Sequence, residues 1–285
     1  MIIDKLNSFL AILNHPMNKS KKFNTIGKIL WWKVNQLFFH LPAIVTFNNN
    51  KMQFICPPAS SYGSLVVYCN LPEYPEMVFL EKILKSNSIF IDVGANIGVY
   101  TILAAAKIKK GKIYSFEPIP SVLNILYQNI RINNANDRVK VIEKVVSDKN
   151  GNEKFVIQDI SEYSHISSNQ TSKSVLMPSV KLDDFCDKEK ISFIDVVKID
   201  VEGEELKVLR GLENYLKSGK VGVLIIEFNS NQVIDYLKKF KYTVFKINKK
   251  LDLEEIKKDD QSVNLVAFLK KDLVDIEKNL KTSTF

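Results

Sequence analysis

From about residue 77 onward, the chain alternates between short apolar runs and longer segments whose apolar residues recur at helical spacing. The apolar runs predict buried strands at 88–93, 112–116, 139–143, 194–199 and 221–226. The segments between them predict helices at 77–84, 99–109, 121–133 and 204–216, then a helix at 232–240 and strands at 242–248 and 263–270. This alternation is typical of an α/β, Rossmann-like, doubly wound domain with a mostly parallel sheet.

One stretch interrupts the alternation. A strand is predicted at 153–158, and the polar residues 159–179 that follow it have no clear period. Long segments of this kind are typical of functional loops. We therefore expect a mobile loop here, which would shape the pocket for an acceptor molecule.

Residues 1–72 are expected to form an N-terminal extension to a domain of residues 73–285. Two amphipathic helices are predicted in this extension, with apolar stripes made by Ile2, Ile3, Leu6, Phe9, Leu10 and Leu13 and by Ile26, Ile29, Leu30, Val34, Leu37 and Phe38. Residues 43–70 predict short strands joined by turns, including 44–47 and 52–55. We expect the helices to pack on the core; pairing in a homo-oligomer and a peripheral membrane contact are the alternatives.

The amino-acid composition gives only weak support for a nucleic-acid-binding protein. The 285 residues include 40 Lys and Arg and 32 Asp and Glu, for a formal net charge of +8. Only Arg131, Arg138 and Arg210 are arginines, so the bidentate donors that nucleic-acid readers favour are scarce. We interpret most of the positive excess as solvated surface.

The cysteines and the apolar segments indicate in which cellular compartment the protein is expected. Cys56, Cys69 and Cys186 are odd in number and have no CxxC spacing, which predicts reduced, partly buried thiols. The start of the sequence has no pattern of a secretory signal, and polar residues interrupt the apolar stretch 26–47, so we expect no membrane-spanning helix. A cytoplasmic protein is the resulting expectation.

A glycine-rich turn follows the first strand of the repeating pattern, at 92–98. Gly94 and Gly98 allow a tight turn and a close approach of the backbone to a ligand, just before a helix begins. A dinucleotide fingerprint G-x-G-x-x-G would need glycines where Asn96 and Val99 stand, so the sequence disfavours NAD.

Two carboxylates refine this prediction. Glu117 ends the second strand, 19 residues after Gly98, where it could accept hydrogen bonds from both hydroxyls of a ribose. Asp92, at the tip of the first strand, could hold the turn or face the ammonium group of an amino-acid cofactor. Together these residues predict a nucleoside cofactor, and an ammonium group opposite Asp92 would suit a methyl-sulfonium amino-acid cofactor rather than NAD.

The region from about Tyr74 to Asn229 resembles the FkbM-type methyltransferases. The resemblance rests on the segments 91–98, 116–118, 128–129, 147–148, 181–184, 198–203 and 209–211, in this order. It implies a class I methyltransferase fold, S-adenosylmethionine as the cofactor and O-methylation, often of sugars in glycans or of natural products. Asp92, Gly94, Asn96, Gly98 and Glu117 match the cofactor positions of the family.

Further candidates lie after the later strands. Asp148 follows the third strand and could bind the adenine amine, although 147–151 could equally form a hairpin turn. Asp200 and Glu202 follow the fourth strand, and either could accept the hydroxyl proton of the acceptor as a general base. Glu227 follows the neighbouring fifth strand, so the three carboxylates are expected to converge.

Other roles for these residues stay open. Asp200 and Glu227 could hold a divalent cation such as Mg²⁺, or Glu202 could simply cap the following helix. His165, in the polar segment, could fold over the site and take part in catalysis.

Three functions therefore compete. The first is methylation of a small-molecule or glycan acceptor at a sugar hydroxyl. A nucleic-acid methyltransferase would need an aromatic and proline cluster after the fourth strand to hold a flipped base, and 200–203 offers none. The third is a non-catalytic protein that uses this fold for interaction, which would fail to bind the cofactor.

Overall fold

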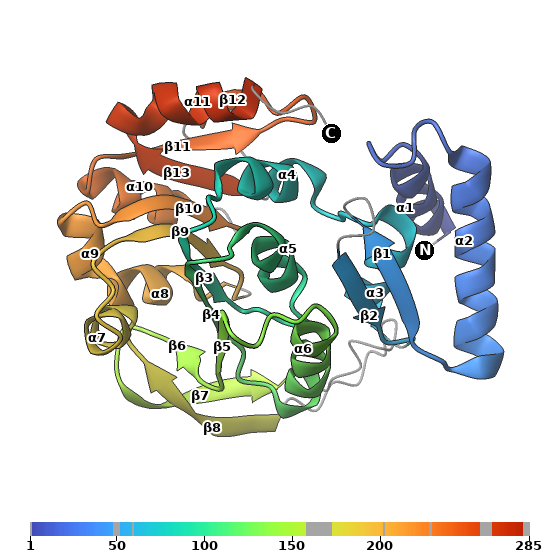
Figure 1. Ribbon diagram of the computed structural model, residues 1–285, viewed down its shortest axis with the longest axis horizontal. Coiled ribbons are helices and arrows are strands. Elements are labelled where there is room, and N and C mark those ends of the chain that lie inside the picture. Colours follow the sequence, from blue (N-terminus) through green and yellow to red (C-terminus); the bar gives the residue numbers. More distant parts are fainter. Residues whose placement is uncertain are drawn as a thin grey trace. The chain divides into compact units, whose positions relative to one another are not determined.

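The computed structural model describes residues 2–47, 52–58, 60–157, 173–201, 203–227, 230–256 and 264–281. It divides into two compact units: unit 1 contains residues 1–74 and 156–174, and unit 2 contains residues 75–155 and 175–285. Figure 1 shows the helices and strands of both units.

Unit 2 is built on an eight-stranded sheet in the order β12-β11-β13-β10-β9-β3-β4-β5. Its strands are β3 (Ile89–Val93), β4 (Lys112–Phe116), β5 (Val139–Ile142), β9 (Ile194–Ile199), β10 (Val221–Ile226), β11 (Tyr242–Ile247), β12 (Leu253–Glu255) and β13 (Leu265–Leu269). The strands β5, β4, β3, β9 and β10 pair in parallel, whereas β13 runs antiparallel to both of its neighbours. This order confirms the doubly wound, class I methyltransferase fold.

Helices cover both faces of this sheet (Figure 1). The chain runs from β3 outward to β5 through α5 (Val99–Lys107) and α6 (Pro120–Ile132), then returns to β9 and β10 on the other side of β3. Right-handed crossovers that reverse direction in this way place their helices on opposite faces. Accordingly α5 and α6 lie on one face and α8 (Glu205–Gly211) and α10 (Asn231–Lys239) on the other.

The remaining elements of unit 2 complete this arrangement. They are α4 (Tyr74–Ile83), α7 (Leu182–Lys188), α9 (Glu213–Lys217), η2 (Lys270–Asp272) and α11 (Leu273–Lys281). The predicted helix 204–216 is in fact two helices, because Leu212 interrupts it between α8 and α9. At the end of α8, a side chain at Gly211 would lie 2.2 Å from the carbonyl oxygen of Ser147, so the backbone there packs too closely for a larger residue.

The prediction of a loop at 159–179 is wrong in its last part. Residues Lys173–Val180 form β8, which lies between β6 (Val145–Val146) and β7 (Gly151–Ile157) in a separate sheet. Because β6 and β7 are not neighbours in that sheet, 147–151 is not the turn of a hairpin. Residues 158–172 lie outside the described part of the chain.

Unit 1 contains the predicted helices α1 (Ile2–Leu13) and α2 (Lys22–Val34), and α2 continues as a π-helical turn, η1 (Asn35–Phe39). The strands β1 (Ala43–Phe47) and β2 (Met52–Cys56) pair in an antiparallel hairpin. The prediction of strands up to residue 70 is wrong beyond β2, because Ser61–Cys69 form the helix α3. Ser60 begins α3 by accepting a hydrogen bond from the backbone N–H of Gly63.

The inward face of α2 is not the predicted apolar stripe, and the packing of α1 and α2 on the core of the domain stays a prediction. Trp32 is fully buried, and its indole N–H donates to the hydroxyl of Ser64 on α3 at 2.8 Å. The predicted stripe itself is largely exposed. Its exposed members are Leu6, Leu10, Leu30, Val34, Leu37 and Phe38.

The three cysteines, Cys56, Cys69 and Cys186, are buried and free, as predicted. Burial raises the pKa of all three thiols, to about 11 for Cys69 and about 12 for Cys186. None of the helices within the described ranges has the length and apolar character needed to cross a membrane.

Candidate active site

The loops that follow β3, β4, β9 and β10 are tied together at the carboxyl edge of the sheet. The backbone N–H of Asp200 donates to the carbonyl oxygen of Val93 at 3.0 Å, and that of Glu227 donates to Ile199 at 3.0 Å. The N–H groups of Gly94 and Ala95 both donate to Phe116. These bonds extend the strand pairing by one residue, so the loops lie next to one another at this edge of the sheet.

Gly94 can only be glycine in this arrangement. Its φ of 78° lies in the left-handed region, and a side chain there would meet the carbonyl oxygen of Asp200 at 1.8 Å. Gly98, with a φ of 93°, comes directly before α5. The turn is therefore pressed against the loop after β9 and leads into a helix N-terminus, where backbone N–H groups are available to a ligand.

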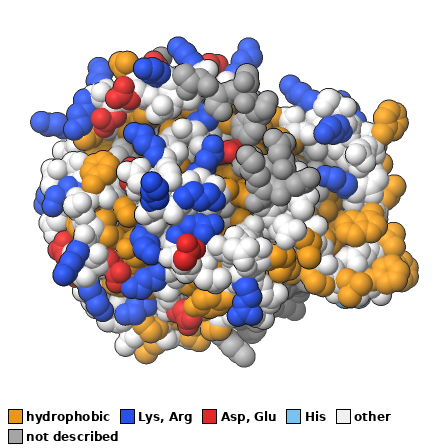
Figure 2. Space-filling model, in the orientation of Figure 1, with side chains coloured by type: hydrophobic (Ala, Val, Ile, Leu, Met, Phe, Trp, Pro, Cys, Tyr) orange, Lys and Arg blue, Asp and Glu red, His pale blue; other side chains and the backbone are white. Residues whose placement is uncertain are grey.

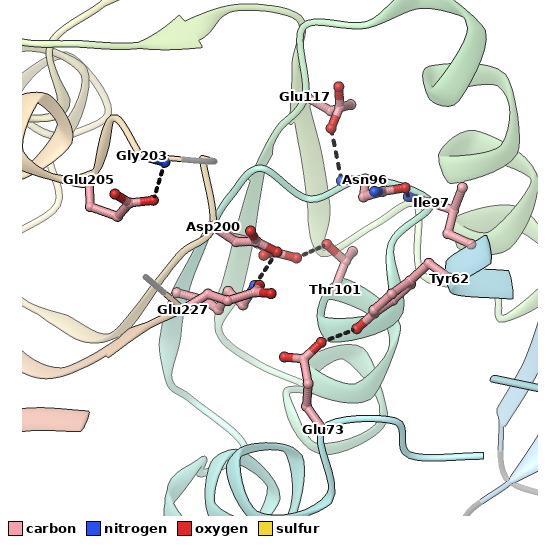
Figure 3. A network of polar contacts seen from close by, with 12 residues as sticks. Tyr62, Glu73, Asn96, Ile97, Thr101, Glu117, Asp200, Gly203, Glu205 and Glu227 are labelled. Carbon is pink, nitrogen blue, oxygen red and sulfur yellow. Dashed lines mark hydrogen bonds and ion pairs between the residues drawn. The ribbon is translucent and has the colours of Figure 1, made fainter. Parts of the chain in front are cut away.

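Glu117 is buried beside this turn. One carboxylate oxygen accepts a hydrogen bond from the backbone N–H of Asn96 at 2.9 Å (Figure 3). The other accepts from the backbone N–H of Ile119, also at 2.9 Å. Asn96 has a φ of 50°, and its own side-chain oxygen accepts from the N–H of Ile97. The acidic side chain thus fixes the conformation of the glycine turn and places an acceptor-only group next to it.

Asp92 faces inward from β3 and is 1% exposed. It accepts a hydrogen bond from the hydroxyl of Thr101 on α5 at 2.6 Å, and Thr101 also contacts the hydroxyl of Ser115 on β4 at 2.7 Å. Burial, opposed by the nearby Lys198 ammonium and by Thr101, raises the pKa of Asp92 to about 6. These contacts tie the end of β3 to α5, and the two expected roles of Asp92, holding the turn and facing an ammonium group, stay predictions.

Lys198 joins the two carboxylates that were expected to carry the chemistry. Its side chain is 3% exposed, and its ammonium lies 2.7 Å from Asp200 and 3.4 Å from Glu227. The ammonium also sits over the ring of Tyr100 on α5, 4.6 Å from its centre. Figure 3 shows Asp200 and Glu227 side by side at the ends of their strands.

This contact sets the charge of Asp200. Burial alone would raise the pKa of the Asp200 carboxyl, but the charge of the Lys198 ammonium and its hydrogen bond to Asp200 help to lower the pKa below its ordinary value. Asp200 is therefore ionised at neutral pH. A carboxylate with a lowered pKa is a weak base but a strong hydrogen-bond acceptor.

A divalent cation at Asp200 and Glu227 finds no support. The Lys198 ammonium already occupies the position between the two carboxylates that a cation would take. Within the part of the chain that the structure describes, no group of three or more His, Cys, Asp and Glu residues could hold a metal ion.

Three sequence candidates are not placed at this site. Asp148 follows β6 of the small sheet, whereas the residue that directly follows β5 is Glu143. Glu202 and His165 lie outside the described residues.

The buried Glu205 was not predicted: it accepts the backbone N–H of Gly203 at 2.9 Å, just before α8 begins. The importance of Lys198 was also missed, although a lysine inside an otherwise apolar strand is the signal that could have revealed it.

Asn129, from the segment 128–129 that resembles the family, supports the glycine turn. It is fully buried on α6, and its side-chain amide donates to the carbonyl oxygen of Ile97 at 2.8 Å.

A tight backbone turn, an acidic acceptor at the end of β4 and a buried acid at the end of β3 suit a nucleoside with an amino-acid tail. The described residues therefore fit S-adenosylmethionine.

Comparison with known proteins agrees with this fit. The Methyltransferase FkbM domain matches residues 92–244, more than half of the chain. Hexuronic acid methyltransferase AglP of Haloferax volcanii is 29% identical over 151 residues, which cover 51% of this chain and 58% of that protein. Methyltransferase sdnD of Sordaria araneosa is 27% identical over 161 residues, 46% of this chain and 62% of that protein. The chain thus spans less than two thirds of these relatives.

Among solved structures, the METTL16 methyltransferase domain aligns with 88% of this chain and 94% of its own, at 14% identity and a TM-score of 0.47. This similarity is too low to support an argument, so the fold is assigned from the strand order of unit 2.

Proposed function

Because the chain belongs to the FkbM methyltransferase family, we propose that it transfers the methyl group of S-adenosylmethionine to a sugar hydroxyl of a glycan or a related small metabolite. The observation that carries this proposal is the cluster of Asp200, Glu227 and Lys198 next to the glycine turn. The activity for which AglP is named, methylation of a hexuronic acid, supports a sugar as the acceptor.

The cofactor would be held by the turn at 94–98, with Glu117 toward the ribose hydroxyls. When bound, S-adenosylmethionine supplies a methyl carbon that is activated by a positively charged sulfur. The protein would orient the acceptor and accept the proton of its hydroxyl group, because that proton must leave as the oxygen attacks the methyl carbon.

Asp200 is suited to orient this hydroxyl. Its carboxylate is ionised and fixed by Lys198, so it can accept a hydrogen bond from the acceptor without first losing a proton. Glu227, whose side chain is 35% exposed, is the more accessible of the two carboxylates and is suited to take up the proton. Lys198 would act as a positioning residue that keeps both carboxylates in place.

The first prediction tests this role of Asp200. Asp200→Asn keeps the size of the side chain and removes its charge, so we expect turnover to fall by about 10²-fold while the affinity for S-adenosylhomocysteine changes little. Methyl transfer from labelled S-adenosylmethionine to a panel of uronic acids and other sugars measures turnover, and calorimetry measures affinity. A chelator should leave the wild-type activity intact, because Lys198 takes the place of a cation.

The matched control is Asp195→Asn. Asp195 lies at the amino-terminal end of the same strand, β9, where its carboxylate accepts a hydrogen bond from the backbone N–H of Ile89 at 2.8 Å. This variant should keep normal turnover even if it loses stability. Full turnover in Asp200→Asn would contradict the proposed role, and cofactor binding without transfer to any sugar would contradict the proposed acceptor class.

A further inference from the structure

Helix α2 and the turn η1 carry their polar and apolar residues in an unusual arrangement. Their inward face consists of Thr25, Trp32 and Asn35, which are all buried, and the amide of Asn35 donates to the carbonyl oxygen of Leu41 at 2.7 Å. A helix on the surface of a soluble protein normally turns its polar side outward. Here the outward side is apolar.

The outward residues form what we call the α2–η1 apolar face, made by Phe23, Leu30, Trp31, Val34, Leu37 and Phe38. Phe23 is 93% exposed and Phe38 is 74% exposed. Figure 2 shows hydrophobic side chains gathered at the right of the view, where α2 lies in Figure 1. Contiguous exposed apolar surface of this kind marks an interaction site.

Positive charge is concentrated in the part of the sequence that contains this face. Residues 5–72 contain seven lysines and no Asp or Glu, so they contribute +7 of the formal net charge of +8. The rest of the chain is nearly balanced, with 40 − 7 = 33 Lys and Arg against 32 Asp and Glu. Lys21, Lys22 and Lys33 are exposed, and Lys33 neighbours Leu30 and Leu37 on the helix surface by its spacing.

We propose that the α2–η1 apolar face docks in the plane of a bilayer that contains anionic lipids. An amphipathic helix with large apolar and aromatic residues on one side and lysines at its edge is suited to lie at the boundary between headgroups and acyl chains. Trp31 has the amphipathic ring that favours this boundary. A second copy of the chain fits less well, because the exposed Lys21, Lys22 and Lys33 of the two copies would be brought together.

Sedimentation of the full chain with vesicles tests this proposal. We expect binding to vesicles of phosphatidylcholine mixed with phosphatidylglycerol, weaker binding to phosphatidylcholine alone, and loss of binding as salt is added. Phe38→Glu should reduce the affinity by about tenfold or more, because it puts a negative charge into the docking face. Lys21→Gln with Lys22→Gln should also weaken binding and lessen its dependence on salt.

The matched control is Val274→Glu on α11, because Val274 is 73% exposed and lies in unit 2. It should bind vesicles like the wild type. Circular dichroism of each variant should match that of the wild type, because the substituted positions are exposed. Equal binding by Phe38→Glu and Val274→Glu, or no binding to anionic vesicles at low salt, would overturn the proposal. A wild type that is dimeric in sedimentation velocity, with a monomeric Phe38→Glu and no vesicle binding, would assign this face to a second copy instead.

Discussion

At the scale of single residues, the buried acid Asp92 has the clearest energetic consequence. Its carboxylate is held among β3, β4 and α5 by the hydroxyl of Thr101, yet burial raises its pKa from 3.8 to about 6. The native state therefore binds more protons than the unfolded chain between pH 3.8 and about 6, and stability falls as the pH rises through this range. Above this range the ionised Asp92 costs about 3 kcal/mol.

We predict that Asp92→Asn increases the free energy of unfolding at neutral pH by about 1–3 kcal/mol and flattens its dependence on pH below 6. Asparagine keeps an oxygen that can accept from Thr101 but has no charge to bury. Urea unfolding at a series of pH values measures this. Thr101→Val serves as the control, because it removes the donor to Asp92 and should destabilise the protein. A loss of stability in Asp92→Asn at neutral pH would show that another group compensates the charge.

At the scale of elements, the glycine turn and the loop after β9 form one unit. The turn accepts no side chain at Gly94, because the carbonyl oxygen of Asp200 lies where a Cβ would stand. The glycine turn, proposed to hold the cofactor, and the proposed catalytic loop therefore pack backbone against backbone. A change in one should disturb the other.

We predict that Gly94→Ala destabilises the protein more than Gly151→Ala and also abolishes binding of S-adenosylhomocysteine. Both glycines have positive φ, 78° and 129°, so both substitutions strain the backbone by about 1–2 kcal/mol or more. Only Gly94 adds a clash, since nothing lies within 4 Å of a side chain at Gly151. Thermal unfolding and calorimetry compare the two variants. Equal losses would show that the turn can move away from Asp200.

The elements that the sequence predicted best are the strands buried on both faces. The ranges of β4, β9 and β10 agree with the predictions to the residue, because each is a short segment of mainly apolar residues with polar residues or glycine close to both ends. The helix α3 was missed because Gly63 and small or β-branched residues give it low intrinsic helix propensity. The strand β8 was missed because it mixes polar residues, a proline and apolar residues.

The candidate site was predictable to the extent that it follows from strand ends. Gly94, Glu117, Asp200 and Glu227 were found because each directly follows or closely follows a strand of the parallel sheet. Lys198 was not: a lysine in an apolar strand signals a buried charge, but its partners Asp200 and Glu227 follow only from the arrangement of the strands in space. The roles of Glu202, His165 and Asp148 stay predictions.

At the scale of the whole molecule, the chain divides into two compact units, each with buried side chains. Unit 1 buries Trp32, Phe54 and Met52, whereas unit 2 buries the faces of the eight-stranded sheet. The chain has only two tryptophans, and Trp31 and Trp32 both lie in α2. Tryptophan fluorescence therefore follows unit 1, while far-ultraviolet circular dichroism is dominated by the sheet and helices of unit 2.

This separation gives a final prediction about the site. If cofactor binding rests on unit 2 alone, S-adenosylhomocysteine should raise the midpoint of the transition followed by circular dichroism more than that followed by tryptophan fluorescence. A ligand at about 100 times its Kd stabilises the state that binds it by about 2.7 kcal/mol, which is ample to separate two transitions. The Gly94→Ala variant is the control, because neither of its transitions should respond to the ligand. Equal shifts by both probes in the wild type would show instead that the units unfold as one, so that binding in unit 2 also stabilises the α2–η1 apolar face.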